Sequence, residues 1–484
     1  MVYDVAVIGC GVIGAATAYE LSHFKLNVLV LEAENDVADG TTKANSAIIH
    51  AGYDPEPNTE MARLNVEGSK LAKDICKKLD VPYKQCGSLV LAFSDDEIPR
   101  LKKLYDNGVA NGVPDIRVIT GDEARKMEPY LSKEVVAALY ALSAAIVNPW
   151  DYALAMAETA VVNGVEIKLR SKVTAIKKQG DLFEIHTTSG VYTAKLVVNA
   201  AGVHAGEIHE MVAAPSFEMH PTSGQYYLMD RSEGGLAGSV IFQCPTKEGK
   251  GVLVAPTVHG NLIVGPDAVP CGEDDVKTTA DGLDYVARMG KKSVPSVDLR
   301  ASIRNFAGVR ANTNKDDFII EVVDGVHGFV DAAGIKSPGL SAAPAIAKKI
   351  CSLLLAEGIE MPFKDNYKGT RKMKRFKQLS DSEKQALIRE NPAYGRVICR
   401  CETITEGEIL DAIRSPITPC SVDGIKRRCN AGMGRCQGGF CGPRVLDILA
   451  RELGVSPLDI LQDKDGTFIL TGQTKKAGEG TADV

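Results

Sequence analysis

The sequence predicts an α/β plus α+β protein: a Rossmann-like domain interrupted by a β-rich insertion and followed by a small, mostly helical domain. Three observations predict this arrangement. A strand, a glycine-rich turn and a helix open the chain, β-type apolar runs such as GSLVLAF, KGVLVAP and GNLIVGP interrupt its middle, and four cysteines form two close pairs near its end. The length of 484 residues is typical of two to four domains.

The first residues have the pattern of a dinucleotide-binding unit. An apolar run at 3–8 is followed by three glycines and then by the helix-forming stretch AATAYELS. The glycines have the G-x-G-x-x-G spacing: Gly9, Gly11 and Gly14. The first makes the turn, the second lets a pyrophosphate approach the backbone, and the third lets the helix pack on the strand. A second apolar strand at 27–31 ends at Glu32, where a carboxylate holds ribose hydroxyls; a solvated strand end is the structural alternative.

Two later segments repeat this strand-then-glycine character. In LVVNAAGVHA a strand at 196–198 precedes Ala201 and Gly202, and in GFVDAAGIKSPGLSAAP a helix opens after Gly334 and Gly339. A nicotinamide-binding domain would show the first segment without these two. Together the three segments resemble the D-amino-acid-oxidase superfamily of flavoproteins, which includes glycerol-3-phosphate dehydrogenases, over roughly residues 1–360.

The resemblance implies an FAD-binding domain of the glutathione-reductase type and a set of residues that contact FAD. That set is Gly9, Gly11, Gly14, Glu32, Thr41, Thr42, Asn45, Ser46, Ala201, Gly202, Gly334, Gly339 and Leu340. It also implies that the FAD domain is discontinuous. We expect an oxidoreductase part at 1–365, with nucleotide-binding parts near 1–80, 145–215 and 325–360 and a substrate domain near 81–144 and 216–324. We expect a basic linker at 366–395, a metal-binding domain at 396–465 and a frayed tail at 466–484.

The cysteines near the C-terminus carry the most specific chemistry in the sequence. Cys399 and Cys401 form C-x-C, and after 34 intervening residues Cys436 and Cys441 form C-x4-C. Thiolates select soft metals, so an iron–sulfur cluster or zinc is indicated, although zinc ribbons more usually have C-x2-C pairs. The block 397–444 resembles the bacterioferritin-associated-ferredoxin type of [2Fe-2S] domain. The resemblance implies that these four cysteines hold the cluster and that Cys429 is a bystander.

Four side chains are candidates for catalysis. His50 in NSAIIHAGYD matches the family segment beneath the flavin ring, as a base, a flavin hydrogen-bond partner or a covalent attachment point. Arg310 in FAGVRAN matches the arginine that clamps the substrate anion, because a guanidinium fork binds phosphate or carboxylate. Lys336 matches a position beside the flavin ring, with a surface lysine as the alternative. His259 is either a pocket residue or a turn histidine.

Tyr226 and its neighbours in SGQYYLM either close the substrate side or pack in an aromatic core. The resemblance implies oxidation of a small anionic hydroxy compound, foremost sn-glycerol 3-phosphate to dihydroxyacetone phosphate, with electrons leaving singly through the cluster. The expected acceptor is a flavoprotein, an iron–sulfur subunit or a quinone chain. The basic run 368–377 and the cations 426–428 would dock an acidic partner, and an anionic-lipid contact is the alternative for the basic run.

Three other functions stay open on the sequence: oxidation of L-2-hydroxyglutarate, oxidation of an amino acid or amine, and service as a non-catalytic electron-transfer subunit. The net charge of −6 gives no case for a nucleic-acid partner. The chain lacks a positive n-region and enters a strand by residue 3, so we expect no signal peptide. We also expect no transmembrane segment, and therefore a cytoplasmic protein, at most peripheral to the inner face of the membrane.

Overall fold

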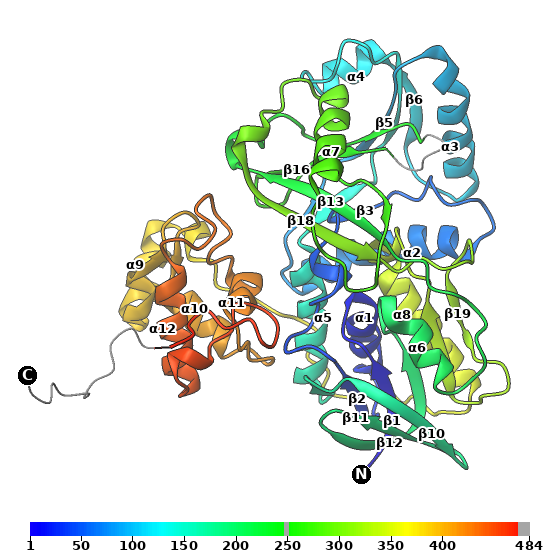
Figure 1. The fold of residues 1–484 in the computed structure, drawn as a ribbon, viewed down its shortest axis with the longest axis vertical. Coiled ribbons are helices and arrows are strands. Elements are labelled where there is room, and N and C mark those ends of the chain that lie inside the picture. Colours follow the sequence, from blue (N-terminus) through cyan, green and yellow to red (C-terminus); the bar gives the residue numbers. More distant parts are fainter. Residues whose placement is uncertain (246–250, 473–484) are drawn as a thin grey trace, which may run out of the picture. The chain divides into compact units, whose positions relative to one another are not determined.

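The computed structural model describes residues 1–245 and 251–472, which fold into two compact units (Figure 1). The first unit is Met1–Met373 and the second begins at Lys374. Residues 473–484, most of the expected tail, lie outside the described residues.

An eight-stranded sheet forms the nucleotide-binding half of the first unit. Its order is β10-β11-β12-β1-β2-β9, with β20 paired to β12 and β19 paired to β20. The strands are β1 (Val2–Ile8), β2 (Val28–Leu31), β9 (Glu166–Lys168), β10 (Val173–Gln179), β11 (Leu182–Thr187), β12 (Gly190–Asn199), β19 (Ile319–Val322) and β20 (Phe329–Ala333). β1 is parallel to both β2 and β12, and β12 is parallel to β20. The three nucleotide-facing segments of the sequence therefore follow neighbouring strands and meet at one edge of the sheet.

Helices cover this sheet and pack closely because their contact faces carry small residues. Figure 1 shows α1 (Val12–Leu21) between α5 (Pro149–Val162) and α8 (Gly339–Ala356). α2 (Glu60–Lys78) packs on α8 so tightly that a Cβ on Gly68 would lie 2.3 Å from the carbonyl oxygen of Ser341. Among the described helices, α8 alone has the length and the mean hydropathy, 1.4, of a membrane span. We did not expect such a helix from the sequence. In the structure, 61% of α8 is buried inside the protein.

A nine-stranded sheet forms the other half of the first unit, above the nucleotide sheet in Figure 1. Its order is β17-β13-β16-β15-β14-β5-β7-β6, with β18 paired to β13. The strands are β5 (Ser88–Ala92), β6 (Ile116–Thr120), β7 (Ala137–Ala141), β13 (Thr222–Met229), β14 (Val240–Gln243), β15 (Leu253–Pro256), β16 (Leu262–Gly265), β17 (Val269–Pro270) and β18 (Ser302–Arg310). β19, at 319–322, pairs with β20, so this segment completes the nucleotide sheet although the sequence placed it in the substrate domain.

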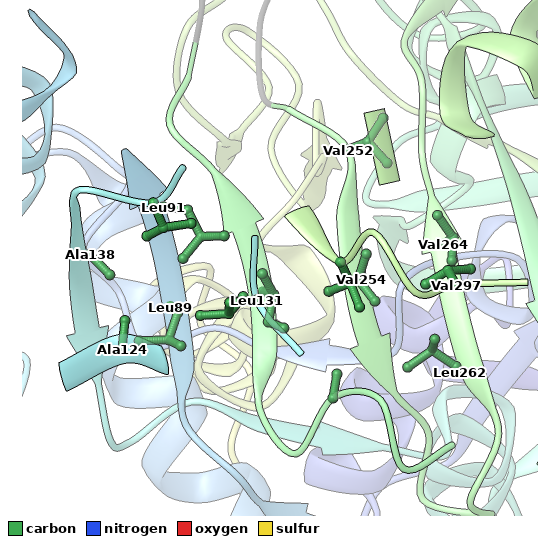
Figure 2. Close-up of a cluster of buried hydrophobic side chains, with 14 of the residues drawn as sticks. Leu89, Leu91, Ala124, Leu131, Ala138, Val252, Val254, Leu262, Val264 and Val297 are labelled. Atoms are coloured by element: carbon green, nitrogen blue, oxygen red, sulfur yellow. The ribbon is translucent and has the colours of Figure 1, made fainter. Parts of the chain in front are cut away.

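The core of the nine-stranded sheet follows from the two-residue period of its strands. Leu89 and Leu91 of β5 point to one face, where they join Val254 of β15 and Leu262 of β16 (Figure 2). This face is covered by α4 (Gly121–Met127) and α7 (Ala280–Ser293), and α3 (Ile98–Ala110) packs on the other face. A small sheet of β3 (Ile48–Ile49), β8 (Ala145–Val147) and β4 (Tyr83–Gln85) lies beside α2 and α8, and α6 (Ala205–Glu210) follows β12.

The stretch 366–395 is folded, which corrects the expectation of a linker. Up to Met373 it belongs to the first unit, where the Arg371 guanidinium is buried against α5 and pairs with Asp151 at 2.8 Å and Glu158 at 2.9 Å. From Lys374 it belongs to the second unit and forms α9 (Asp381–Glu390), which begins with a capping box. The basic composition suggested a solvated linker, but the fold buries Arg371 in an ion network and forms a capped helix from 381 to 390.

The second unit has its own hydrophobic core, built from helices around a short hairpin. The hairpin strands are β21 (Val397–Cys399) and β22 (Ile404–Thr405), and the helices are α9, α10 (Glu406–Ile413), α11 (Val422–Cys429) and α12 (Gly442–Leu453). Ile409, Ile425 and Leu449 are fully buried in this core. The end of β21 and the turn after it carry Cys399 and Cys401, and the loop that leads into α12 carries Cys436 and Cys441.

Candidate functional site

The glycine turn at the end of β1 leaves the N-terminus of α1 open to an anion. Gly9 has a φ of +92°, and a Cβ there would lie 2.6 Å from the Ala200 carbonyl oxygen. A Cβ on Gly14 would lie 1.9 Å from the Gly9 carbonyl oxygen, so both glycines are required by the close packing. At Gly11 the nearest atom to a Cβ would be the Thr42 hydroxyl at 3.4 Å, and no side chain caps α1 at this residue. The turn therefore fits a pyrophosphate, held by backbone N–H groups and the positive end of the helix.

Glu32 is fixed at the end of β2 by the turn itself. Its Oε2 accepts a hydrogen bond from the Cys10 backbone N–H at 2.7 Å, and its Oε1 accepts one from the Glu34 N–H at 2.9 Å. Burial raises the pKa of this carboxyl group, while these two N–H donors act in the opposite direction. Each carboxylate oxygen keeps a lone pair beyond these bonds, so the group fits a ribose diol.

The loop at 41–50 ties the glycine turn to both neighbouring parts of the first unit. The Thr42 hydroxyl accepts a hydrogen bond from the Val12 N–H at 2.9 Å, at the start of α1. The Thr41 hydroxyl donates to the Val309 carbonyl of β18 at 2.6 Å, and the Asn45 amide donates to the Thr42 carbonyl at 2.8 Å. The structure thus places Thr41, Thr42 and Asn45 in one loop that is fixed to α1 and to the substrate sheet.

The second and third segments begin where β12 and β20 end, side by side. Ala201 donates its N–H to the Asn199 side chain at 3.3 Å, and Gly202 has a φ of +62° with open space where a Cβ would stand. Gly334 has a φ of +63°, and Gly339 opens α8, where a Cβ would lie 2.6 Å from the Ile335 side chain. Leu340, next in α8, is half-buried. These segments share the sheet edge with the glycine turn.

A buried network that sequence reasoning missed holds these two strand ends together. The Asn199 amide donates to Asp331 at 2.8 Å, and the other Asp331 carboxylate oxygen lies 2.6 Å from His209 Nδ1. Burial raises the pKa of Asp331. The network joins residues 122 or more positions apart, so no local pattern announces it.

The backbone of His50 is fixed by three hydrogen bonds with neighbouring helices. Its N–H donates to the Ser341 hydroxyl at 2.7 Å, and its carbonyl accepts from Asn65 and Ser69. The imidazole Nε2 lies 3.2 Å from the Ser337 hydroxyl and the ring stacks on Phe242. A small pocket beside the ring is lined by His50, Gly52, Tyr53, Asp54, Pro55, Asn65, Ser337 and Pro338. The partner Ser337 was not foreseen because it lies 287 positions away.

Arg310 is half-buried, and its charge is not neutralised by a carboxylate in the part of the chain that the structure describes. Its guanidinium donates to the Ser223 carbonyl at 3.3 Å and to the Asp267 carbonyl at 3.1 Å, and it bonds the Tyr226 hydroxyl. The Asp267 carboxylate is instead occupied by Gln225, at 2.7 Å from both the backbone and the amide nitrogen. A Cβ at position 224 would lie 2.5 Å from Nη2, so Gly224 makes room for the guanidinium.

Tyr226 connects Arg310 to the loop at 41–50. Its hydroxyl lies 3.1 Å from the Ser46 hydroxyl, and its ring stacks on Phe306 with centroids 4.7 Å apart. Burial raises the pKa of Tyr226. The arrangement brings Ser46, Tyr226 and Arg310 together as one polar cluster on an aromatic support.

The last two catalytic candidates, Lys336 and His259, lie in two different loops of the first unit. Lys336 is half-buried in the loop before α8, and its ammonium donates to the Lys315 carbonyl at 3.4 Å. The His259 ring lies 3.2 Å from Asn148, which caps α5, and its carbonyl accepts from Arg231. The structure thus ties His259 to the N-terminus of α5 through Asn148.

The four cysteines come together in the second unit as two pairs. The Cys401 thiol lies 3.5 Å from the Cys436 sulfur, and Cys399 hydrogen-bonds with Cys441. The bond from Cys441 lowers the pKa of Cys399 to about 6, while the same bond raises the pKa of Cys441. Within the described residues, the only three His, Cys, Asp or Glu ligand atoms that lie within 4.8 Å of one another belong to His204, Glu207 and Glu273, so the cysteines do not form such a compact group.

Two separated thiol pairs fit a binuclear centre better than one tetrahedral ion. A zinc ion with bonds of about 2.3 Å would draw all four sulfurs to within roughly 4 Å of one another. A [2Fe-2S] cluster instead takes four cysteines around two irons. Cys441 is also the N-cap of α12, whose positive end favours a thiolate. Cys429 is half-buried at the end of α11, and desolvation raises its pKa to about 12.

The cations 426–428 do not form an exposed field, which corrects the sequence expectation. Lys426, Arg427 and Arg428 are only 7%, 6% and 6% exposed. Arg427 pairs with Asp463 at 2.7 Å, and Arg428 donates to the carbonyls of Gly424 and Ile417. Their charges are used inside the unit and are not available to a docking partner.

Comparison with known proteins agrees with this geometry. The chain belongs to the family of FAD dependent oxidoreductases, which it matches over residues 4–353. Residues 397–451 match the BFD-like [2Fe-2S] binding domain. The chain is therefore an oxidoreductase whose cofactors are FAD and a [2Fe-2S] cluster.

Individual relatives within this family have named substrates. A glycerol 3-phosphate dehydrogenase of Caloramator mitchellensis is 48% identical over 98% of this chain and 99% of its own. A glycerol 3-phosphate oxidase of Mycoplasma genitalium is 35% identical over 72% of this chain and 94% of its own. A human mitochondrial L-2-hydroxyglutarate dehydrogenase is 31% identical over 55% of this chain and 61% of its own.

Among solved structures, the FAD-bound, dithionite-reduced L-alpha-glycerophosphate oxidase of Mycoplasma pneumoniae superposes with a TM-score of 0.74 at 34% identity. The superposition covers 77% of this chain and 99% of the oxidase chain.

Proposed function

We propose that this protein oxidises sn-glycerol 3-phosphate to dihydroxyacetone phosphate and passes the electrons one at a time through its [2Fe-2S] cluster to a separate acceptor. The observation that carries the proposal is the 48% identity to a glycerol 3-phosphate dehydrogenase along 98% of the chain, which spans both units. The relatives named for L-2-hydroxyglutarate match a shorter part at lower identity.

Arg310 is the proposed anion clamp. Its two carbonyl contacts fix the plane of the guanidinium, and no described carboxylate competes for its charge. A phosphate accepts two parallel N–H···O bonds from such a fork. The Tyr226 hydroxyl, held by Ser46 and Arg310, adds one further donor at the same place.

His50 is the proposed proton acceptor. FAD, when bound, supplies the two-electron acceptor for the hydride that leaves the substrate carbon. The substrate hydroxyl must lose its proton in the same reaction, and His50 Nε2, beside the Ser337 hydroxyl, is the nitrogen we assign to receive it. The three hydrogen bonds to the His50 backbone hold the ring in place for this transfer.

We assign supporting roles to the other two candidates. Lys336, in the loop that also carries Ser337, would supply positive charge for the reduced flavin. His259 would orient the end of the substrate sheet over the site through Asn148.

The appended second unit accounts for the proposed route of the electrons. The relative named as an oxidase matches 72% of this chain while 94% of its own length is covered, so it lacks a counterpart of the second unit. A [2Fe-2S] centre carries one electron, whereas the hydride delivers two. We therefore expect oxygen to be a poor acceptor and a flavoprotein, an iron–sulfur subunit or a quinone chain to be the physiological one.

The test is anaerobic mixing of the purified holoprotein with sn-glycerol 3-phosphate, L-2-hydroxyglutarate and a panel of amino acids, followed by the visible absorption of both cofactors. We expect glycerol 3-phosphate to bleach the flavin first and the cluster next. Faster bleaching by L-2-hydroxyglutarate would reassign the substrate. No bleaching by any compound, with reduction by an external donor intact, would favour the non-catalytic electron-transfer role.

A further inference from the structure

The [2Fe-2S] site opens to solvent at one edge, and this edge carries an exposed aromatic side chain. Cys401 is exposed and its partner Cys436 is half-buried, whereas Cys399 and Cys441 are buried. Phe440, adjacent to Cys441, is 85% exposed, more than any other large apolar side chain in the described residues except Met1. The Phe440 backbone N–H bonds the Cys436 sulfur, so the ring is attached directly at the open edge.

Three exposed arginines lie in the same two segments as the cysteines. The two segments that carry the cysteines, 397–402 and 432–444, contain three arginines: Arg400, Arg435 and Arg444. All three are exposed, and none forms an ion pair within the described residues. The single acidic residue of these segments, Glu402, is 7% exposed. The open edge is therefore cationic, while the cations 426–428 are buried elsewhere in the unit.

We propose that Phe440 and the rim of Arg400, Arg435 and Arg444 form the docking surface for an acidic, one-electron redox protein. Protein–protein interfaces are enriched in aromatic residues and arginine, which this edge combines, and its positive charge favours a negatively charged partner face. The proposal rests on the proposed function, because it assigns the place where electrons leave. Each reduced cluster gives one electron to one acceptor, so each substrate molecule reduces two acceptor molecules.

The experiment uses two c-type cytochromes as probes, one acidic and one basic, so that charge differs while the haem reaction is the same. The holoprotein is reduced with a stoichiometric donor and mixed with either cytochrome in a stopped-flow instrument, and binding of each cytochrome in the oxidised state is measured by calorimetry. We expect faster reduction and tighter binding of the acidic cytochrome at low salt, with the difference lost as salt rises.

Variants locate the surface. Arg435→Glu, Arg444→Glu and Phe440→Ser should each lower the second-order rate constant with the acidic cytochrome. The variant that combines Arg435→Glu with Arg444→Glu should lower it roughly tenfold. Arg389→Glu on α9 and Phe468→Ser are the matched controls, because both residues are exposed in the same unit and lie outside the two cysteine segments. Cluster content, measured as iron and sulfide, should be unchanged in all of them.

The outcomes separate this proposal from the proposed function. Bleaching of the flavin by glycerol 3-phosphate is measured in every variant, and the proposal requires it to stay at the wild-type rate. If the variants slow the passage of electrons from flavin to cluster and leave cytochrome binding intact, the surface serves the protein's own flavin unit and the proposal is wrong. An equal loss of rate with the acidic cytochrome in the control variants would also overturn the proposal. So would binding of the protein to anionic vesicles that Phe440→Ser abolishes while reduction of the cytochrome persists.

Discussion

The Cys401 sulfur lies 3.5 Å from the Cys436 sulfur across 35 positions of sequence. The first cysteine lies in the turn between β21 and β22 and the second in the loop before α12. Together with the Cys399–Cys441 pair, this contact brings the loop before α12 against the hairpin of β21 and β22. The four cysteines that we propose as cluster ligands are therefore positioned by a fold that has its own core.

Replacing Cys436 with serine should abolish the cluster and leave FAD bound, because the cysteine pairs and the glycine turn lie in different units. The measurement is iron, sulfide and flavin content of protein purified without oxygen. Cys429→Ser is the control: its half-buried thiol has a raised pKa and should be dispensable, so this variant should keep the cluster. Zinc in place of iron in the wild type would remove the assignment.

Replacing Arg310 with lysine should lower kcat/KM for glycerol 3-phosphate by one to two orders of magnitude. An ammonium keeps the charge but cannot form the two-pronged contact, and a charge-assisted hydrogen bond is worth about 1.5–3 kcal/mol. FAD content should not change, and Arg300→Lys, an exposed arginine in the same unit, should behave as wild type. An unaltered kcat/KM in the Arg310 variant would place the anion site elsewhere.

FAD affinity should increase with pH in the acidic range. Burial raises the pKa of Glu32 in the FAD-free protein, so the protonated form persists to higher pH than for an ordinary carboxyl. Ribose hydroxyls donate to the ionised form, and FAD binding therefore strengthens as pH rises through the raised pKa and weakens as pH falls below it. Titration of the apoprotein with FAD checks this. Glu32→Gln should bind FAD more weakly and lose the pH dependence; a pH dependence retained in Glu32→Gln would mean that another group is responsible.

Replacing Arg371 with methionine should destabilise the first unit by about 3–5 kcal/mol, because it leaves the buried carboxylates of Asp151 and Glu158 without a counter-charge. Denaturant unfolding followed by flavin fluorescence measures the effect. Arg300→Met removes an exposed ion pair and should leave the midpoint essentially unchanged. Adding Asp151→Asn and Glu158→Gln to the Arg371 variant should restore part of the lost stability, and no recovery would argue against charge burial as the cause.

The sequence was sufficient where local pattern and chemistry coincide. The runs at 3–8 and 27–31 became β1 and β2, because fully buried parallel strands need continuous apolar residues. Gly9 and Gly14 were predicted from the G-x-G-x-x-G spacing, and the structure shows backbone packing there that leaves no room for a Cβ. The strand at 196–198 proved to be the end of a longer strand, β12, whose first half is more polar and exposed.

Long-range pairing was beyond the sequence. The contacts of Tyr226 with Ser46 and of His50 with Ser337 join residues 180 and 287 positions apart, so their types gave no hint of a partner. The same limit explains why two basic segments were wrongly predicted to be solvent-exposed. Arg371 and Arg427 look like solvated cations in a basic sequence, but each is buried by a carboxylate from a remote segment. A run of lysines and arginines indicates composition, and only the fold decides which of them meet water.

The central place of β1 in its sheet has a consequence for synthesis of the protein on the ribosome. One edge of this apolar strand is covered by β2 almost at once, but the other is covered by β12, which ends at Asn199. At the usual ~5–20 residues per second, the nascent chain exposes that edge for roughly ten to forty seconds. Until then the unpaired edge of β1 can pair with a neighbouring nascent chain, so the long separation between β1 and β12 is itself a source of misassembly during synthesis.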